Sequence, residues 1–286
     1  MADADGGRGA VVITGASTGI GKACALQLDG HGFRVFAGVR KDEDAERLRG
    51  EGSERLQPVK IDVTDEQSIA SAANEVRDAV AERGLAGLVN NAGVALPGPL
   101  EFIPIEEFRR QIEVNLVGQV ATTQAFLPLL RKGNGRVVNI GSIGGRVALP
   151  FVGPYAASKF AMEAVTDSLR RELRPWGIEV SIVEPGGTST AIWERGTGAA
   201  RTIQAKLPPQ ADGLYGPAME RMTKIAAEID RNGMPPSAVA DVVEHALTAA
   251  KPKTRYLVGR DAKLRARLAK VLPDRTFDRL IARAMR

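Results

Sequence analysis

This 286-residue sequence contains only one cysteine and no long uninterrupted hydrophobic run. The single cysteine, Cys24, cannot form an internal disulfide, which agrees with a reducing compartment, and its apolar helical surroundings favour a buried side chain over a reactive thiol. No hydrophobic run approaches the roughly 20 residues that span a bilayer, and the acidic start of the chain lacks the apolar core of a signal peptide. These absences predict a cytoplasmic protein.

Aromatic residues are also scarce, at 5% of the chain, and the excess of positive charge lies at one end. Residues 251–286 contain 12 Lys or Arg and 3 Asp or Glu, so this segment is basic. Residues 1–250 contain 27 Lys or Arg and 31 Asp or Glu, so the rest of the chain is slightly acidic. A nucleic-acid-binding face is normally built into the folded body of a protein, and here no aromatic residues interleave with the basic ones. We therefore predict no nucleic-acid partner.

The sequence does contain a regular alternation of short apolar segments and longer segments with helical spacing. The predicted strands are Ala10–Thr14, Phe33–Val39, Leu56–Ile61, Gly87–Asn90, Arg136–Ile140, Ile178–Val183 and Arg255–Val258. Because parallel neighbours need crossover connections, the alternation predicts an α/β fold, a doubly wound parallel seven-stranded sheet with helices on both faces. We predict one domain over residues 1–260, with its ligands at the carboxyl ends of the strands.

Two segments depart from this alternation. Residues 184–236 are rich in Pro and Gly, and we predict a mobile substrate loop there with a short helix at Ala218–Ile229, because a long structureless stretch is unusual in a compact domain. Residues 261–286 form a basic extension, where apolar residues at helical spacing on either side of Pro273 predict two amphipathic helical pieces. Docking on the protein body and attachment to an anionic membrane surface are both open for this extension.

A glycine-rich turn follows the first predicted strand and precedes the helical segment Lys22–Asp29. The predicted cofactor contacts in it are Gly15, Ser17, Thr18, Gly19, Ile20 and Gly21. Glycines let the backbone approach a phosphate closely, and the start of a helix favours a negative pyrophosphate. The spacing Gly-x-x-x-Gly-x-Gly differs from the common Gly-x-Gly-x-x-Gly, so a glycine-rich turn without a ligand remains an alternative for this motif alone.

Arg40 directly follows the second predicted strand, where NAD-binding folds tend to carry an acid and NADP-binding folds a base. This charge favours NADP(H) as the cofactor, with NAD(H) as the alternative. Further cofactor contacts are predicted after the third and fourth strands, at Asp62, Val63, Asn91, Ala92 and Gly93. Alternatively, Asp62 caps a helix beginning near Asp65, and Asn91 is a turn former.

Tyr155 and Lys159 are four residues apart at the start of a predicted helix, so both side chains lie on one face. An adjacent ammonium and a cationic nicotinamide would stabilise the phenolate and lower the pKa of the tyrosine. Ser142, directly after a strand, can hydrogen-bond a carbonyl oxygen that gains negative charge. Asn115, in the helical pattern Phe108–Leu130, either holds a water that extends a proton path to Lys159 or makes a structural hydrogen bond. We predict no metal in this site.

Together these residues resemble the short-chain dehydrogenase/reductase family over about residues 10–190. The resemblance rests on Thr14-Gly-Ala-Ser-Thr-Gly-Ile-Gly21, Asn90-Asn-Ala-Gly93, Asn115, Ser142, Tyr155-x-x-x-Lys159 and Pro185-Gly186, in family order. It implies a Rossmann-like fold, a homodimer or homotetramer, and Tyr155 as the acid or base, with Lys159 lowering its pKa and binding ribose. It also implies cofactor contacts by Pro185, Gly186, Thr188 and Thr190, although the valine usual at Thr188 is missing.

Three further stretches, Phe126–Leu130, Ser168–Pro175 and Ser181–Gly186, resemble the family branch that holds retinol and 17β-hydroxysteroid dehydrogenases. This likeness implies hydride transfer between NADP(H) or NAD(H) and a lipophilic secondary alcohol or ketone. The alternative is a catalytically silent protein that binds NAD(P)H as a sensor or scaffold.

Overall fold

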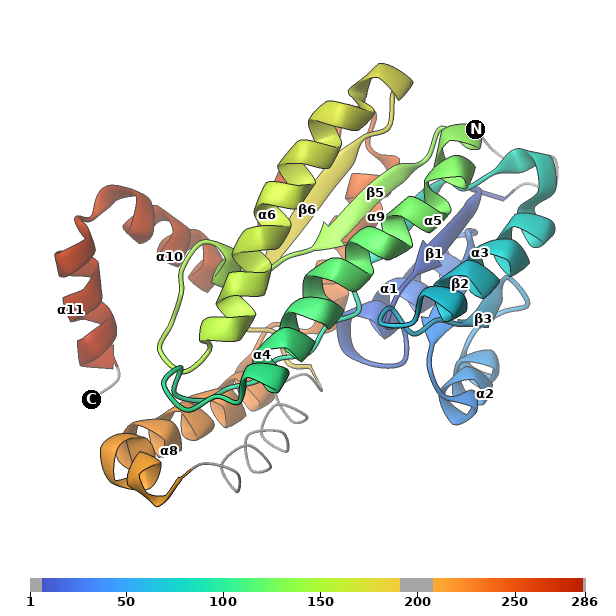
Figure 1. Cartoon of the computed structure of the whole chain (residues 1–286). Coiled ribbons are helices and arrows are strands. Elements are labelled where there is room, and N and C mark those ends of the chain that lie inside the picture. The colour runs from blue at the N-terminus through green and yellow to red at the C-terminus, as the bar shows by residue number, and fades with distance from the viewer. Residues whose placement is uncertain (1–6, 191–207, 285–286) are drawn as a thin grey trace.

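Seven parallel strands form one sheet in the computed structural model, which describes residues 7–190 and 208–284. The strand order is β3-β2-β1-β4-β5-β6-β7 (Figure 1). The strands are β1 Ala10–Ile13, β2 Arg34–Val39, β3 Leu56–Lys60, β4 Gly87–Asn90, β5 Arg136–Ile140, β6 Val180–Pro185 and β7 Arg255–Val258. All the predicted strands are confirmed, and the largest difference is in β6, which lies two residues further along the chain than predicted.

Helices cover both faces of the sheet, as the alternation predicts (Figure 1). The α-helices are α1 Gly19–Gly30, α2 Asp42–Glu51, α3 Glu66–Val80, α4 Ile105–Ile112, α5 Gly118–Lys132, α6 Gly153–Leu173, α8 Pro209–Asn232, α9 Pro236–Thr248, α10 Arg260–Val271 and α11 Asp274–Ala284. Short helical turns are η1 Ala81–Arg83, η2 Glu113–Val117, η3 Ile143–Gly145 and η4 Arg174–Trp176. Residues of α1, α2 and α9 build the core on one face of the sheet, and residues of α3 and α5 build the core on the other.

The central strand β1 shows why the strands read as unbroken apolar runs. Val11 and Ile13 pack into one core, whereas Ala10 and Val12 pack into the core on the opposite face. A parallel sheet that is buried on both faces needs apolar side chains on both. Cys24 belongs to the first core, where burial raises the pKa of its thiol to about 12, so the prediction of a buried and unreactive cysteine is confirmed.

The chain reverses its direction across the sheet at β1. From β1 it continues through β2 to the edge strand β3, and it then returns to β4 on the other side of β1. The loops that follow β1 and β4 therefore separate at the carboxyl ends of these strands. Doubly wound sheets bind their ligands in the crevice at this point.

The prediction of a mobile loop over residues 184–236 is wrong for much of that range. Strand β6 continues to Pro185, α8 is a helix of 24 residues, and α9 begins at Pro236. The short helix predicted at Ala218–Ile229 is the middle of α8. Prolines were a misleading signal because Pro209 and Pro236 occupy the first helical positions, where a missing N–H costs no hydrogen bond. The part of the predicted loop at residues 191–207 lies outside the described residues.

The C-terminal segment forms the two predicted helices, α10 and α11, which are separated at Pro273. Ala262 of α10 forms a buried cluster with Ile143 and Val147, close to the end of β5, and Phe277 of α11 packs against this cluster. The rest of α11 extends away from the sheet (Figure 1). Across the described ranges, we find no helix that is long and apolar enough to cross a membrane.

Candidate active site

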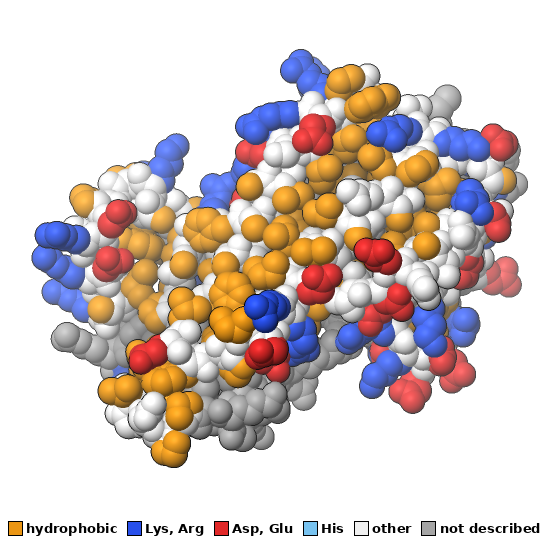
Figure 2. Space-filling view, viewed as in Figure 1, with side chains coloured by type: hydrophobic (Ala, Val, Ile, Leu, Met, Phe, Trp, Pro, Cys, Tyr) orange, Lys and Arg blue, Asp and Glu red, His pale blue; other side chains and the backbone are white. Residues whose placement is uncertain are grey.

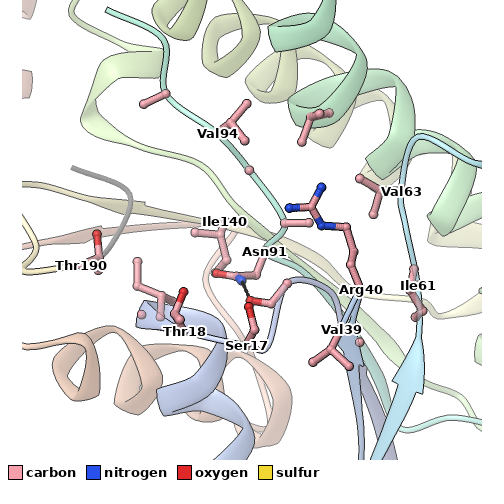
Figure 3. A pocket seen from close by; sticks show the side chains of 18 of the residues that line it. Ser17, Thr18, Val39, Arg40, Ile61, Val63, Asn91, Val94, Ile140 and Thr190 are labelled. Carbon is pink, nitrogen blue, oxygen red and sulfur yellow. Dashed lines mark hydrogen bonds between the residues drawn. The ribbon is translucent and has the colours of Figure 1, made fainter. Parts of the chain in front are cut away.

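A cavity of about 570 Å³ lies at the carboxyl ends of the central strands (Figure 3). Most of the predicted site residues line it: Gly15, Ser17, Thr18, Gly19, Ile20, Arg40, Asp62, Val63, Asn91, Ala92, Gly93, Ser142, Tyr155, Lys159, Pro185, Gly186, Thr188 and Thr190. Of the predicted site residues, Gly21 and Asn115 are not among those that line the cavity. Six strands, β1 to β6, thus bring residues far apart in the sequence into one site.

The glycine loop has the shape of a close-fitting cradle for a phosphate. Gly15 has a positive φ of 64°, and a Cβ at this position would lie 2.8 Å from the Cα of Ala92. A Cβ on Gly21 would collide with the carbonyl oxygen of Gly15 and the side-chain amide of Asn91. Gly21 therefore allows α1 to pack closely against Gly15 and Asn91, and it supports the loop without lining the cavity. Because α1 begins at Gly19, which lines the cavity, its positive end and first amides favour an anion such as a pyrophosphate.

Asn91 ties the end of β4 to this loop. Its Nδ2 donates hydrogen bonds to the carbonyl oxygens of Thr14 (2.9 Å) and Gly15 (3.0 Å). The Thr14 hydroxyl oxygen in turn accepts from the backbone N–H groups of Asn91 (2.9 Å) and Ala92 (3.0 Å). Thr14 was quoted in the motif but not predicted as a site residue, and its role is to hold the two sides of the crevice together.

The far end of the cavity carries an exposed positive charge. Figure 3 shows the Arg40 side chain extending from the end of β2 into the pocket, with Val63 on one side and Asn91 on the other. The guanidinium is 67% exposed, and its nearest carboxylate, Asp62, is 3.9 Å away, so this exposed pair contributes little. Lys41 and Arg47 also line the cavity, and Arg47 donates to the Ser17 carbonyl at 2.9 Å.

The alternative role considered for Asp62, a helix cap, is wrong. Asp65 is the N-cap of α3, and its carboxylate accepts hydrogen bonds from the backbone N–H groups of Gln67 and Ser68. The Asp62 carboxylate instead accepts from the N–H and hydroxyl of Thr64, at 3.0 and 2.8 Å, while it lines the cavity.

Tyr155 and Lys159 lie on the first two turns of α6, as predicted, and both line the cavity. The Lys159 Nζ is 5.8 Å from the centre of the Tyr155 ring and donates to the carbonyl oxygen of Ile140 at 2.7 Å. Burial lowers the pKa of Lys159 to about 8, an effect that the negative charge of Glu163 opposes. With this pKa, Lys159 is mostly protonated at neutral pH and loses its proton as the pH rises through about 8.

The pKa of Tyr155 is raised, whereas a neighbouring ammonium alone would lower it. Burial raises the pKa of Tyr155 above its ordinary value, and a hydrogen bond with the Ser142 side chain opposes this increase. Ser142 follows β5 directly and is the N-cap of η3, where its Oγ accepts from the N–H of Gly144 at 3.0 Å. The protein alone therefore keeps the phenol neutral, in the state that can donate a proton.

Asn115 lies in η2, a π-helical turn that interrupts the predicted helix Phe108–Leu130. Single π-turns inside α-helices are frequent at functional sites. The buried Asn115 side chain accepts from the N–H of Val94 at 2.8 Å and donates to the Val94 carbonyl at 2.9 Å and to Ser158 Oγ at 3.1 Å. These bonds give it the structural role that was one of the two alternatives, and the water-holding role stays a prediction.

The segment after β6 is held by a residue that the sequence did not reveal. Asp261 of α10 accepts a hydrogen bond from the N–H of Gly187 at 2.9 Å. A Cβ on Gly186 would overlap the same carboxylate. The side chain of Thr188 donates to the Gly186 carbonyl at 3.2 Å. The start of α10 is therefore part of the site's support, and the position of Asp261 just beyond β7 is the signal that could have indicated it.

Metal chemistry has no visible support in the part of the chain that the structure describes, where no group of three or more His, Cys, Asp or Glu side chains could hold an ion. The residues that are present instead fit a dinucleotide. The glycine loop at the start of α1 can hold the pyrophosphate, and Tyr155 and Lys159 line the same cavity.

Comparison with known proteins agrees with this geometry. Residues 9–199 match the family model described as short chain dehydrogenase. The chain is 43% identical to retinol dehydrogenase 16 of Homo sapiens over 259 residues, covering 89% of this chain and 81% of the relative. It is 40% identical to 17-beta-hydroxysteroid dehydrogenase type 6 of Bos taurus over 282 residues, covering 96% and 88%. A short chain dehydrogenase from Burkholderia cenocepacia, solved in complex with NADP, superimposes with a TM-score of 0.73 at 29% identity, with 97% of each chain covered.

The chain belongs to the short-chain dehydrogenase family. It is an oxidoreductase that transfers a hydride between a nicotinamide cofactor and an alcohol or ketone. The predicted likeness to the branch of retinol and 17β-hydroxysteroid dehydrogenases is confirmed, and the comparisons give no support to the alternative of a silent sensor.

Proposed function

We propose that the enzyme interconverts a lipophilic secondary alcohol and its ketone, with NADP(H) as the preferred cofactor. The observation that carries the cofactor preference is Arg40, a guanidinium that extends into the cavity from the end of β2 and is 67% exposed. A base at this position matches the 2′-phosphate of NADP, whereas an acid would match the free ribose hydroxyls of NAD. Lys41 adds a further positive charge to the cavity lining, whereas Arg47 is paired with Asp44.

The lipophilic substrate is supported by the apolar residues beside the catalytic end and by the relatives. Val94, Ala95 and Leu96 line the cavity there. Outside the cavity lining, Tyr215 of α8 makes edge contacts with the rings of Phe102 and Phe151, at 5.9 and 6.0 Å between ring centres. The relatives named above act, by their names, on retinol and on hydroxysteroids.

The proposed roles of the catalytic residues follow from the geometry. When bound, the nicotinamide accepts or supplies the hydride. The neutral Tyr155 hydroxyl donates a proton to the substrate oxygen during reduction and recovers it during oxidation. Ser142 hydrogen-bonds the same oxygen, and the Lys159 ammonium stabilises the transient phenolate and can bind a ribose hydroxyl.

A screen of steroids, retinoids and smaller ketones, with NADPH and NADH in parallel, tests both parts of this proposal. We expect turnover of a lipophilic ketone at a higher kcat/KM with NADPH than with NADH. A clear preference for NADH would falsify the assignment of Arg40, and turnover confined to small hydrophilic ketones would contradict the substrate class.

We also propose a homodimer or homotetramer built through the outer surface of α5 and α6. Figure 2 shows hydrophobic side chains gathered over these helices. Val117, just before α5, and Phe160 of α6 are each 45% exposed, and a contiguous apolar patch of this kind marks a protein–protein interface. Light scattering should give a multiple of the 30.4 kDa chain mass, and a monomer would contradict this proposal.

For the basic extension we propose peripheral attachment of a cytoplasmic protein to an anionic membrane surface. Leu264, Val271 and Leu280 are 58%, 71% and 42% exposed on α10 and α11, among Lys and Arg side chains. Apolar and cationic residues on the same helices favour binding to the interface of an anionic bilayer. Deletion of residues 274–286, which removes α11 but leaves α10 and Asp261 in place, should weaken co-sedimentation with anionic liposomes. Undiminished binding by the deletion variant would contradict the proposal.

A further inference from the structure

Next to the catalytic lysine lies a partly buried group of charged side chains that the proposed mechanism does not use. Glu163 of α6 follows Lys159 by one helical turn, and its Oε2 accepts from Arg255 Nε of β7 at 3.0 Å. Glu184 of β6, which is fully buried, lies with its Oε1 2.9 Å from Arg146 Nε and 3.8 Å from Arg255 Nε. Three elements of the active site therefore meet at one pair of carboxyl groups.

The two carboxyl groups contact each other, and each has an oxygen that its arginine does not satisfy. Glu163 Oε1 and Glu184 Oε2 are buried, and neither has a hydrogen-bond partner among the described residues, although the two side chains are close enough for Glu184 to affect the pKa of Glu163. Two carboxylates cannot hydrogen-bond one another unless one of them carries a proton, because an ionised carboxylate is only an acceptor. Burial and the neighbouring Glu184 raise the pKa of Glu163 to about 7, despite the opposing effect of Arg255. A proton shared by the pair satisfies both otherwise unpartnered oxygens.

Each member of this group is connected to a catalytic segment. Glu184 immediately precedes Pro185, which lines the cofactor cavity. Arg146 follows η3, the turn whose N-cap is Ser142. Gly145 of that turn packs so closely on α6 that a Cβ there would be 2.9 Å from the Lys159 carbonyl oxygen and 3.3 Å from Glu163 Cγ. A change of charge at Glu163 therefore takes place one helical turn from Lys159, beside a turn that packs against both residues.

We propose that Glu163 is a positioning residue that keeps the proton on Lys159 above neutral pH, and that the proton it shares with Glu184 sets the pH at which it begins to do so. This inference rests on the role proposed above for Lys159. It goes beyond that role because it assigns the control of the lysine's charge to a pair of carboxyl groups outside the cavity.

The signs of the effects agree with this assignment. Below neutral pH the pair holds its proton, Glu163 is neutral, and Lys159 is protonated without help because its pKa is about 8. As the pH rises through about 7, Glu163 becomes negative and stabilises the ammonium in the range where burial would otherwise remove its proton. The charged groups around Glu163 are Lys159 and Asp167 from its own helix, Glu184 from β6, Arg255 from β7, which also pairs with Asp167, and Arg146 after η3, which pairs with Glu184.

Titration of the full-length, cofactor-free protein by NMR tests the inference without any need for turnover. With 13C at the ε carbon of lysine, and with Lys159→Arg to assign its signal, the Lys159 resonance should shift in two steps. The first step should coincide with ionisation of Glu163 near pH 7, and the second should report Lys159 itself. A single step at the lysine midpoint alone would overturn the proposal, and this result needs no substitution at the carboxyl pair.

Glu163→Gln then removes the charge while keeping a side chain that can accept from Arg255 and donate to Glu184. The first step should disappear, and the Lys159 midpoint should fall by about one pH unit. Asp167→Asn is the matched control, since Asp167 also binds Arg255 (2.9 Å) but lies a further turn away from Lys159. It should leave both steps in place. A Glu163→Gln protein that folds and keeps the original lysine midpoint would overturn the proposal.

Activity provides a separate readout. In Glu163→Gln the alkaline limit of kcat for alcohol oxidation should move to lower pH, while kcat at the optimum stays within a few fold. If Tyr155→Phe leaves turnover intact, the proposed mechanism fails, but the lysine titration still decides the charge coupling. The two failures can therefore be told apart.

Discussion

Replacement of Asn115 by alanine gives the sharpest test of how the catalytic crevice is held in shape. The amide makes three hydrogen bonds, two with the backbone of Val94 and one with Ser158 Oγ. Each intramolecular hydrogen bond contributes about 1 kcal/mol net. The substitution should therefore lower the free energy of unfolding by about 3 kcal/mol, since three hydrogen bonds are lost and the N–H of the half-buried Val94 is left without a partner, while its carbonyl keeps the bond from Gln111.

Urea denaturation, followed by circular dichroism with and without NADPH, measures this loss. Asn74→Ala is the matched control, because Asn74 is an amide on α3 that accepts a hydrogen bond only at the surface, from Arg77. It should change the free energy of unfolding by less than about 0.5 kcal/mol. A similarly small effect of Asn115→Ala on stability, together with a large loss of kcat, would refute the structural reasoning and favour the role in holding a water.

Three other substitutions have expected outcomes. Tyr155→Phe should reduce kcat by about 10²-fold or more while NADPH affinity, measured by fluorescence titration, is retained; equal loss of both would argue for a structural role. Arg40→Ala should raise KM for NADP(H) about tenfold and leave KM for NAD(H) unchanged in steady-state assays. Equal effects on both KM values would contradict a contact between Arg40 and the 2′-phosphate. The hydrogen bond from Arg255 lowers the pKa of Asp167 from 3.8 to about 2. Asp167 therefore stabilises the folded protein above pH 3.8, and this stabilisation is lost as the pH falls towards 2. In Asp167→Asn the stability measured by urea should therefore fall less steeply between pH 4 and 2, and an unchanged slope would contradict this.

The strands and the glycine loop could be predicted from the sequence because their signals are local. A strand that is buried on both faces, such as Ala10–Ile13, must be apolar throughout, and the tight turn after it needs glycine at Gly15, where φ is positive. Tyr155 and Lys159 share a helix face, so their spacing alone placed them together.

The rest of the site depends on contacts between distant segments, which no local pattern encodes. Asp261 reaches Gly187 from a helix after the last strand, and Glu163 meets Glu184 only because α6 packs over β6. The prolines of α8 and α9 gave a loop signal although they start helices. Whether a proline begins a helix or belongs to a loop is decided by the packing of the residues that follow it.

The central claim is that this site moves a hydride between a nicotinamide and a carbonyl carbon, and an isotope transfer experiment tests it most directly. The full-length enzyme is incubated with NADPH that carries deuterium at both C4 positions of the nicotinamide and with a panel of retinoid and steroid ketones and aldehydes. Mass spectrometry should show an alcohol product that carries one deuterium on carbon, formed by the unsubstituted enzyme and strongly reduced in Tyr155→Phe. If the protein binds NADPH but no product carries deuterium, the account of its chemistry is contradicted.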